Sequence, residues 1–393
     1  MEELKEIKKP YFLEKNLRII YSITLTAIMG VASLSPALPE IQQHFQVTKI
    51  QVGYLIMIFT LPGIILTPIM GILADRFGRK VVLVPSLILF GIAGGLCAFT
   101  TSFVWLLGLR FLQGIGAASL GSLNVTIIGD LYHGKSRGIA MGYNASILSL
   151  GTALYPFLGG FLAQIGWNWP FVLAFMAIPV SMVVLFTLKL EKPSIDVRFS
   201  TYLSETLKNI RKKEPLALFC ASILSFIILY GAMITYFPFL MKQKFNSSPL
   251  TIGLLMSLVS VGSAFTSSNL GYLQSRFTSK KMLLMAYTLY AVACFTIPFV
   301  SQLTILVIPI IIFGFAQGAN LPNLLTLISN HAPPANRAGF MSTNGMALRT
   351  GQTLGPLIMG TLYGIGDIEA VFIGGGVIAM MLFIMIRLII VDR

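Results

Sequence analysis

Twelve apolar runs, each long enough to cross a lipid bilayer, dominate this sequence. A helix of about 20 apolar residues spans the roughly 30 Å hydrocarbon core of a membrane. With 55% of its 393 residues hydrophobic and 11% charged, the chain carries more apolar surface than a soluble fold buries. The sequence therefore predicts an all-α integral membrane protein with twelve transmembrane helices. The runs cover residues 18–39, 50–74, 80–99, 103–129, 136–165, 168–190, 215–241, 249–274, 281–300, 303–329, 336–365 and 368–390. The first run is too long for a signal peptide and no small-residue cleavage site follows it, so we expect it to remain as the first helix.

Basic residues indicate how the helices are oriented. Lys and Arg in short loops are retained on the cytoplasmic side of a membrane. Of the 28 basic residues, 23 fall in the tails and loops that would lie on one side, against three on the other. Both termini should therefore be cytoplasmic. The net charge of +14 then reflects topology and attraction to anionic lipid, so we expect membrane lipid as a partner and no nucleic acid.

The chain repeats itself at an offset of 200 residues. Residues of the first half recur in the second half as the same residue types, for example Gly71, Arg76 and Lys80 as Gly271, Arg276 and Lys280. An even number of spans in each half makes the two repeats parallel. We expect two six-helix bundles, 18–190 and 215–390, with cytoplasmic tails at 1–17 and 391–393.

The segment between the bundles, 191–214, is rich in charge. Its apolar residues recur at helical spacing, which predicts an amphipathic helix on the cytoplasmic membrane surface. A solvated linker is the alternative. The apolar positions are Ile195, Phe199, Leu203, Leu207 and Ile210.

A charged loop between the second and third runs carries a motif. Residues 71–83 read G-I-L-A-D-R-F-G-R-K-V-V-L. This loop resembles the signature G-x-L-A-D-R-x-G-R-K-x-x-L of the major facilitator superfamily of secondary transporters, and it matches every specified position. The resemblance extends over nearly the whole chain and implies a solute transporter with a central cavity, small-molecule substrates, no cofactor and a monomeric state by default.

The same resemblance implies a cytoplasmic latch. Asp75 ends a helix whose dipole disfavours an anion, so it should face a positive group. The family pattern supplies that group as the amino end of the eleventh helix, near 336–339, with Gly71 allowing the two helices to approach. Arg79 would pair with Asp130, and Gly78 would make the turn. The latch residues are thus Gly71, Asp75, Arg76, Gly78, Arg79 and Asp130. A plain positive-inside loop is the alternative for the arginines. In the second copy, Ser275 and Thr278 replace Asp75 and Gly78.

Two further stretches resemble proton-driven drug and metabolite exporters within that superfamily. Residues 106–118 match the helix 4 pattern L-x-x-x-R-x-x-Q-G-x-G-A-A. The helix 5 pattern G-x-x-x-G-P-x-x-G-G is matched except that Tyr155 replaces one Gly. Such small residues permit close helix packing, with or without a role in coupling. The predicted packing residues are Gly151, Pro156, Gly159, Gly160, Gly355 and Pro356.

Two arginines lie within the apolar runs, and no carboxylate is predicted at that depth. Arg349 stands near the middle of its run, and an unpaired guanidinium there would suit an anionic or zwitterionic substrate. Snorkelling, or bonding to Asn344, Gln352 or a carbonyl, is its alternative role. Arg110 would pair with Glu40 or polar neighbours and shift the pKa of an acid, or it would be a structural residue bonded to helix carbonyls.

Proton coupling needs groups that titrate, and the sequence offers few. We expect Glu40 and Asp130, assisted by Arg110, to carry it, with His44 as a further candidate. Polar side chains within the runs are candidates to bind substrate beside Arg349, although interhelical hydrogen bonds are an equal alternative. These are Asn124, Asn144, Asn320, Asn344 and Tyr230.

The sequence shows no catalytic or metal-binding arrangement. Cys97, Cys220 and Cys294 each lie alone in a different run, which indicates neither a disulfide framework nor a metal site. An enzyme or a channel is therefore disfavoured. We expect an exporter of amphipathic molecules in a bacterial plasma membrane, working by alternating access in exchange for protons. A proton-independent facilitator, importer or lipid flippase for an anionic amphiphile is the alternative.

Overall fold

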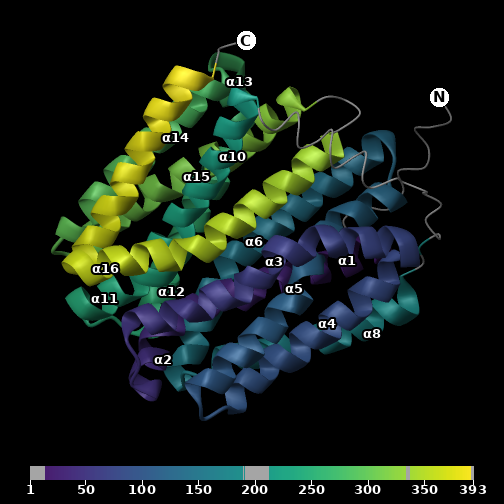
Figure 1. Cartoon of the computed structure of the whole chain (residues 1–393), viewed down its shortest axis with the longest axis horizontal. Helices are drawn as coiled ribbons and strands as arrows, with labels where there is room; N and C mark the ends of the chain where they lie inside the picture. Colours follow the sequence, from purple (N-terminus) through teal and green to yellow (C-terminus); the bar gives the residue numbers. More distant parts are fainter. Residues whose placement is uncertain (1–13, 189, 191–211, 333–336, 391–393) are drawn as a thin grey trace.

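The computed structural model describes residues 14–188, 190, 212–332 and 337–390. Every regular element in these residues is a helix (Figure 1). The predicted linker helix and both predicted tails lie almost wholly outside the described residues. Where the two can be compared, the helices follow the predicted apolar runs, because a long run without internal breaks leaves the helix as the only regular structure that pairs its backbone within lipid.

The first half of the chain forms one bundle. Short 3₁₀ segments at Ser35–Ala37, Cys97–Phe99 and Leu173–Met176 extend or connect its helices. The helices are α1 (Lys15–Ala32), α2 (Leu38–Phe45), α3 (Lys49–Phe77), α4 (Arg79–Leu96), α5 (Phe103–Leu131), α6 (Gly134–Ile165), α7 (Trp169–Val172) and α8 (Ala177–Thr187).

The second half forms the other bundle. Between α10 and α11 the chain runs through a π-helix, η5 (Ile228–Tyr236), in which the Thr235 hydroxyl donates to the carbonyl of Tyr230 at 2.7 Å. The helices are α10 (Lys213–Ile227), α11 (Phe237–Phe245), α12 (Pro249–Ser268), α13 (Leu270–Arg276), α14 (Ser279–Thr296), α15 (Leu303–His331) and α16 (Arg337–Ile389), with a 3₁₀ segment at Ile297–Phe299.

The described residues hold 11 helices, or continuous helical segments, long and apolar enough to span a membrane. The last of them, α16, has 53 residues and is broken at Gly366 and Asp367, where Asp367 takes a φ of 58°. At 1.5 Å per residue an unbroken helix of that length would measure about 80 Å, far more than a bilayer core. Figure 1 shows α16 folding back on itself, so it contains two antiparallel segments.

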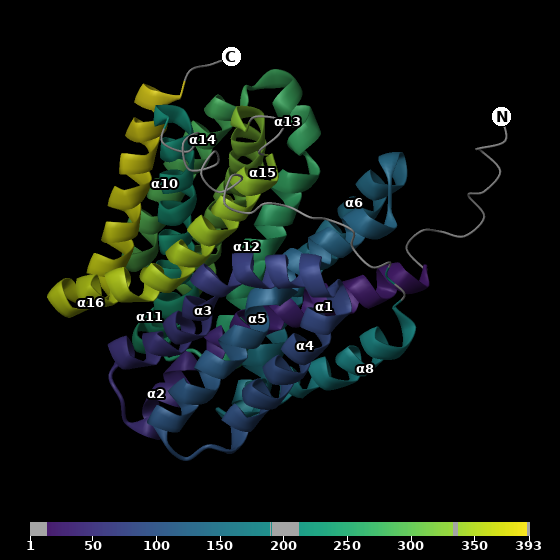
Figure 2. The ribbon, with the colours of Figure 1, turned by 45° about the vertical axis from the view of Figure 1, so that its right-hand side comes forward.

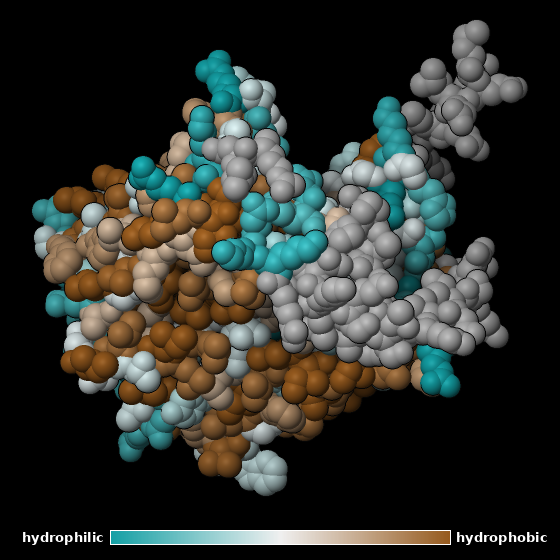
Figure 3. Space-filling model, turned by 45° about the horizontal axis from the view of Figure 1, so that its top comes forward, coloured by the Kyte–Doolittle hydropathy of each residue, from teal (hydrophilic) through white to brown (hydrophobic). Residues whose placement is uncertain are grey.

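Large apolar side chains cover much of the outside of the molecule. Phe186 is 78% exposed, Leu388 77% and Ile65 66%. Figure 3 shows this apolar surface in brown, spread over both bundles, with hydrophilic residues gathered at the projecting tips. A surface of this kind is stable against lipid and unfavourable in water, as expected for a membrane-embedded protein.

Backbone contacts close the interface between the bundles at one end. A Cβ atom added to Gly253 in α12 would lie 2.2 Å from the carbonyl oxygen of Pro156 in α6. One added to Gly160 would lie 2.3 Å from the carbonyl of Pro249. These two glycines therefore let α6 and α12 meet backbone to backbone. Within the first bundle, Gly159 meets the carbonyl of Ser33 in the same way.

The bundles separate toward the other end. Gly53, Thr60 and Gly71 lie on one face of α3, since they are spaced by whole numbers of helical turns. Gly53 contacts Pro356 and Thr60 bonds to Thr353, but a Cβ added to Gly71 meets no described atom within 4 Å. The same holds for Gly142 in α6 and Gly345 in α16. Figure 2 shows α6 and α12–α13 diverging toward the start of α6. We refer to the two ends as the closed end and the open end.

Candidate functional site

Arg349 lies at the point where the bundles separate. On facing surfaces of α3 and α16, the contacts run from Gly53 with Pro356, through the Thr60–Thr353 hydrogen bond of 2.9 Å, to Gly63 with Arg349. A Cβ added to Gly63 would lie 3.1 Å from Cδ of Arg349, so the arginine stem crosses α3 where that helix has no side chain. Arg349 is thus the last contact before the open end.

Polar neighbours on its own bundle hold the guanidinium of Arg349. Its Nη1 donates to Oε1 of Gln352 at 3.2 Å. The hydroxyl of Tyr230, from η5, lies beside both residues, and the Tyr230 ring stacks on Phe226 with centroids 5.8 Å apart. The predicted alternative of a bond to Gln352 is therefore present. Among the described residues, none of the ion pairs includes Arg349.

Arg110 is a buried structural cation in the first bundle. Its side chain is 1% exposed, Nε donates to the carbonyl of Leu55 at 3.2 Å, and Nη1 donates to Gln113 at 2.6 Å. The guanidinium also lies 4.2 Å from the centroid of the Phe59 ring. The structure therefore favours the helix-carbonyl alternative. It does not show the predicted pairing with Glu40, because α2 carries Glu40 to the closed end and toward the other bundle.

Glu40 instead forms an ion pair across the closed end. Its Oε1 lies 3.0 Å from Nζ of Lys242 in α11, and the two side chains are 27% and 28% exposed. Beside this pair, Nζ of Lys49 donates to Gln243 at 2.7 Å, also from one bundle to the other. His44 stacks on Trp167 with ring centroids 4.5 Å apart. Among the predicted titratable groups, it is therefore Glu40 whose charge is paired with a residue of the other bundle.

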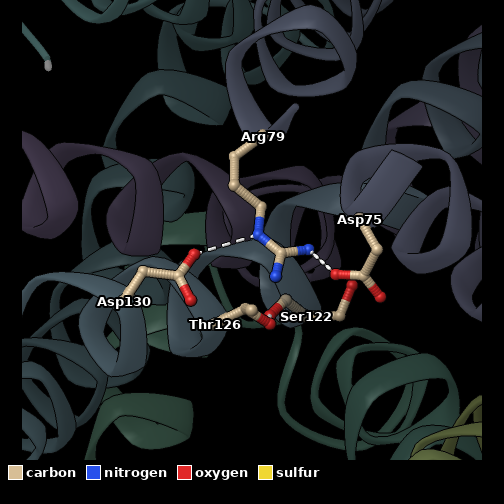
Figure 4. A network of polar contacts seen from close by, with 5 residues as sticks. All are labelled: Asp75, Arg79, Ser122, Thr126 and Asp130. Carbon is tan, nitrogen blue, oxygen red and sulfur yellow. Dashed lines mark hydrogen bonds and ion pairs between the residues drawn. The ribbon is translucent and has the colours of Figure 1, made fainter. Parts of the chain in front are cut away.

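The signature loop forms a charged cluster at the open end. Arg79, 8% exposed, pairs with Asp75 and donates from Nε to Asp130 at 3.0 Å (Figure 4). Asp130 stands one turn after Thr126 on α5, whose hydroxyl donates to the carbonyl of Ser122 at 2.9 Å. The predicted pairing of Arg79 with Asp130 is confirmed. Gly78 takes a φ of 102° and turns the chain from α3 into α4, as expected.

Other expectations for this cluster differ from the structure. The positive group beside Asp75 is Arg79 rather than the amino end of α16, whose predicted contact stretch, 336–339, lies partly outside the described residues. Gly71 touches no other described helix, because the bundles have separated before reaching it. Arg76 is exposed and lies over the Phe77 ring, 5.4 Å from its centroid. Both ion pairs of Arg79 therefore join helices of the first bundle only.

The predicted asparagines are buried within the bundles. Oδ1 of Asn144 accepts from Thr24 at 2.5 Å and from Asn124 at 3.3 Å, which joins α1, α5 and α6. Asn344, its counterpart 200 residues later, accepts from Ser222 at 2.8 Å. Asn320, 1% exposed, lies beside Tyr290. These contacts favour the interhelical alternative over substrate binding.

Several site residues were not identified from the sequence. Gln352 could have been recognised because it follows Arg349 by three positions on the same helix face. Lys242 could have been found by comparing α2 and α11, which occupy corresponding positions in the two repeats. Gly63, Thr60 and Thr353 carry no local signal, since their importance depends on how α3 docks against α16.

No cluster of His, Cys, Asp or Glu in the described part of the chain could hold a metal ion. Cys97 and Cys294 are buried and Cys220 is half-buried, and all three are free thiols. The polar chemistry of these residues is therefore hydrogen bonding and charge pairing between helices.

Comparisons with known proteins agree with this architecture. The chain is 27% identical over 355 residues to Multidrug resistance protein 2 of Bacillus subtilis, covering 88% of each chain. It is 26% identical over 371 residues to Quinolone resistance protein NorA of Staphylococcus aureus, covering 91% of this chain and 92% of that protein. The crystal structure of the nucleoside transporter NupG superposes with a TM-score of 0.82 at 13% identity, covering 96% of this chain and 100% of that one. The family model described as Major Facilitator Superfamily matches residues 20–244 and 218–393. The chain therefore belongs to the Major Facilitator Superfamily of multi-pass membrane transporters.

Proposed function

We propose that this chain exports a small amphipathic molecule from a bacterial cell by alternating access, in exchange for protons. It would act in the plasma membrane as a monomer with twelve transmembrane helices, counting the two segments of α16 separately. Both termini would be cytoplasmic, so the cluster of Asp75, Arg79 and Asp130 marks the cytoplasmic side. The described conformation would then be open to the cytoplasm.

One observation carries this proposal. The same faces of α3 and α16 touch at one end and separate at the other, and a cationic side chain lies at the junction. A site between two bundles that is accessible from one side only is what alternating access requires. Relatives named for multidrug and quinolone resistance favour export over import.

The two charged clusters would act in opposite conformations. Glu40 and Lys242 hold the closed end in the present state. The cluster around Arg79 would engage the second bundle when the open end closes, as a latch. Protonation of a carboxylate weakens its ion pair, so Glu40 on the outer side and Asp130 on the inner side would transmit the proton gradient to these contacts. Arg110 would keep α3 and α5 fixed relative to each other.

Transport into everted membrane vesicles tests the proposal. Norfloxacin is a suitable probe, as is 1-naphthoate, and an acidic vesicle lumen supplies the driving force. We expect accumulation of at least one probe that a protonophore abolishes and that Glu40→Gln combined with Asp130→Asn removes. Accumulation unaffected by the protonophore would favour the proton-independent facilitator. Absence of accumulation for both probes, with the protein folded in the vesicles, would refute export.

A further inference from the structure

The charge at the junction of the bundles has no balancing carboxylate in the described residues. Every described acid lies within two residues of a helix end or of the break in α16. These acids are Glu14, Glu40, Asp75, Asp130, Glu214, Asp367 and Glu369. Arg349 is 12 residues beyond the start of α16 and 17 before Gly366, about 18 Å and 26 Å along the helix. The acids at the helix ends are therefore too far along α16 to pair with it.

Arg349 is also positioned to meet a ligand. Its stem is fixed against Gly63 of the opposite bundle, and one guanidinium nitrogen is held by Gln352. Beyond Arg349, toward the open end, Gly71 and Gly345 on the facing surfaces contact nothing among the described residues. The guanidinium therefore stands at the base of the diverging surfaces, where a molecule entering from the open end would reach it.

Aromatic rings flank the same position. Tyr230 lies beside the guanidinium, and its ring stacks on Phe226 at an interplanar angle of 18°. This pair comes from the junction of α10 with the π-helix η5, and π-helical turns are frequent at functional sites. A cation beside a stacked aromatic pair complements a ligand with an anionic group attached to a ring.

We propose that Arg349 binds the anionic group of an aromatic carboxylate, with Gln352 beside it and the ring of the ligand against Tyr230. This inference rests on the proposed function and narrows its substrate class. A guanidinium binds carboxylate through two parallel hydrogen bonds, and such bonds are strong where water is scarce. An organic cation would meet electrostatic repulsion at the same point. Because Arg349 touches α3 and belongs to α16, the bound anion would lie where both bundles can sense it.

Ligand binding by purified protein tests the inference with two probes of similar shape and opposite charge. 1-Naphthoate carries a carboxylate, and 1-naphthylmethylamine carries an ammonium on the same ring system. Ligands that bind the folded state raise its unfolding temperature. We expect 1-naphthoate to stabilise the native protein, and the amine to stabilise it little or not at all.

Variants assign the effect to Arg349. Arg349→Ala should weaken 1-naphthoate binding about tenfold to a hundredfold, the range typical of charge-assisted hydrogen bonds. Arg349→Lys, which keeps the charge, should retain part of the affinity. Lys281→Ala is the matched control, since it removes one exposed positive charge at the start of α14 and should bind as the native protein does. Near-ultraviolet circular dichroism establishes that each variant is folded.

Two results would overturn the inference: equal stabilisation by both probes, or native affinity for 1-naphthoate in Arg349→Ala. Norfloxacin transport by the native protein separates this failure from failure of the proposed function. If norfloxacin accumulates in vesicles while 1-naphthoate binding ignores Arg349, export stands and the anion site falls. If neither probe accumulates but 1-naphthoate binds through Arg349, the anion site stands and export falls.

Discussion

Neutralising Glu40 should loosen the closed end of the molecule. Glu40 and Lys242 stand 3.0 Å apart, one on each bundle, with about a quarter of each side chain exposed. In a water-like dielectric, charges at this separation attract by about 1.4 kcal/mol, and partly exposed pairs retain roughly 0.2–1 kcal/mol after screening and loss of side-chain entropy. Losing about 1 kcal/mol from the state closed at this end would raise the ratio of the opened state about fivefold.

A cysteine reporter at the closed interface measures that ratio. Met256 is 7% exposed, and its sulfur lies 3.4 Å from the hydroxyl of Ser35 in the other bundle. In a chain whose native cysteines are replaced, Met256→Cys should react with a polar maleimide only when the closed end opens. If that state is a minor one, the reaction rate is proportional to its population. We therefore expect about fivefold faster labelling after Glu40→Gln.

A second reporter and two controls make the test specific. Ser149 lies two turns before Pro156 on the interface face of α6 and is exposed, so Ser149→Cys should label more slowly when the population shifts away from the present state. Glu369→Gln, which removes an exposed acid near the same end, should change neither rate. Exchanging the charges in a Glu40→Lys, Lys242→Glu double variant should restore the native rates. An unchanged Met256→Cys rate in Glu40→Gln, or a double variant no better than Glu40→Lys alone, would refute the gating role of this pair.

Three further substitutions test the packing and the latch. Gly253→Ala places a methyl group 2.2 Å from the Pro156 carbonyl and should cost about 1–3 kcal/mol of the closed interface, seen as faster Met256→Cys labelling, whereas Gly142→Ala, with no described atom within 4 Å, should not change that rate. Asp75→Asn should reduce norfloxacin transport while leaving folding and membrane insertion intact, and full transport would remove Asp75 from the latch. Asn144→Ala deprives two donors of their acceptor, so it should lower the free energy of unfolding by about 1–3 kcal/mol, more than Asn344→Ala, which leaves one donor unpaired; equal unfolding temperatures for both variants would contradict this ranking.

The distribution of roles between the two arginines shows where prediction from sequence stopped. Both arginines stand inside apolar runs, and the sequence suits each of them to a structural or a functional role. The structure separates them, because Arg110 is enclosed by α3 and α5 of one bundle while Arg349 reaches across to Gly63 of the other. The asparagines illustrate the same point, since a polar residue in a spanning helix looks alike in sequence whether it faces a neighbouring helix or a substrate.

Features that depend on short windows of the chain were determined by the sequence alone. Apolar run length specifies the helices, the 200-residue repeat specifies two related bundles, and the motif at 71–83 specifies the family and the Arg79–Asp130 pair. Only the tertiary structure decided that Glu40 pairs with Lys242, that the bundles meet at Gly160 and Gly253, and that Arg349 lies where they part. These contacts join residues far apart in the chain through the docking of two rigid bundles. A transporter that alternates between two arrangements has the same sequence in both, so which end is closed depends on the free-energy balance between the two docked states and not on any local pattern.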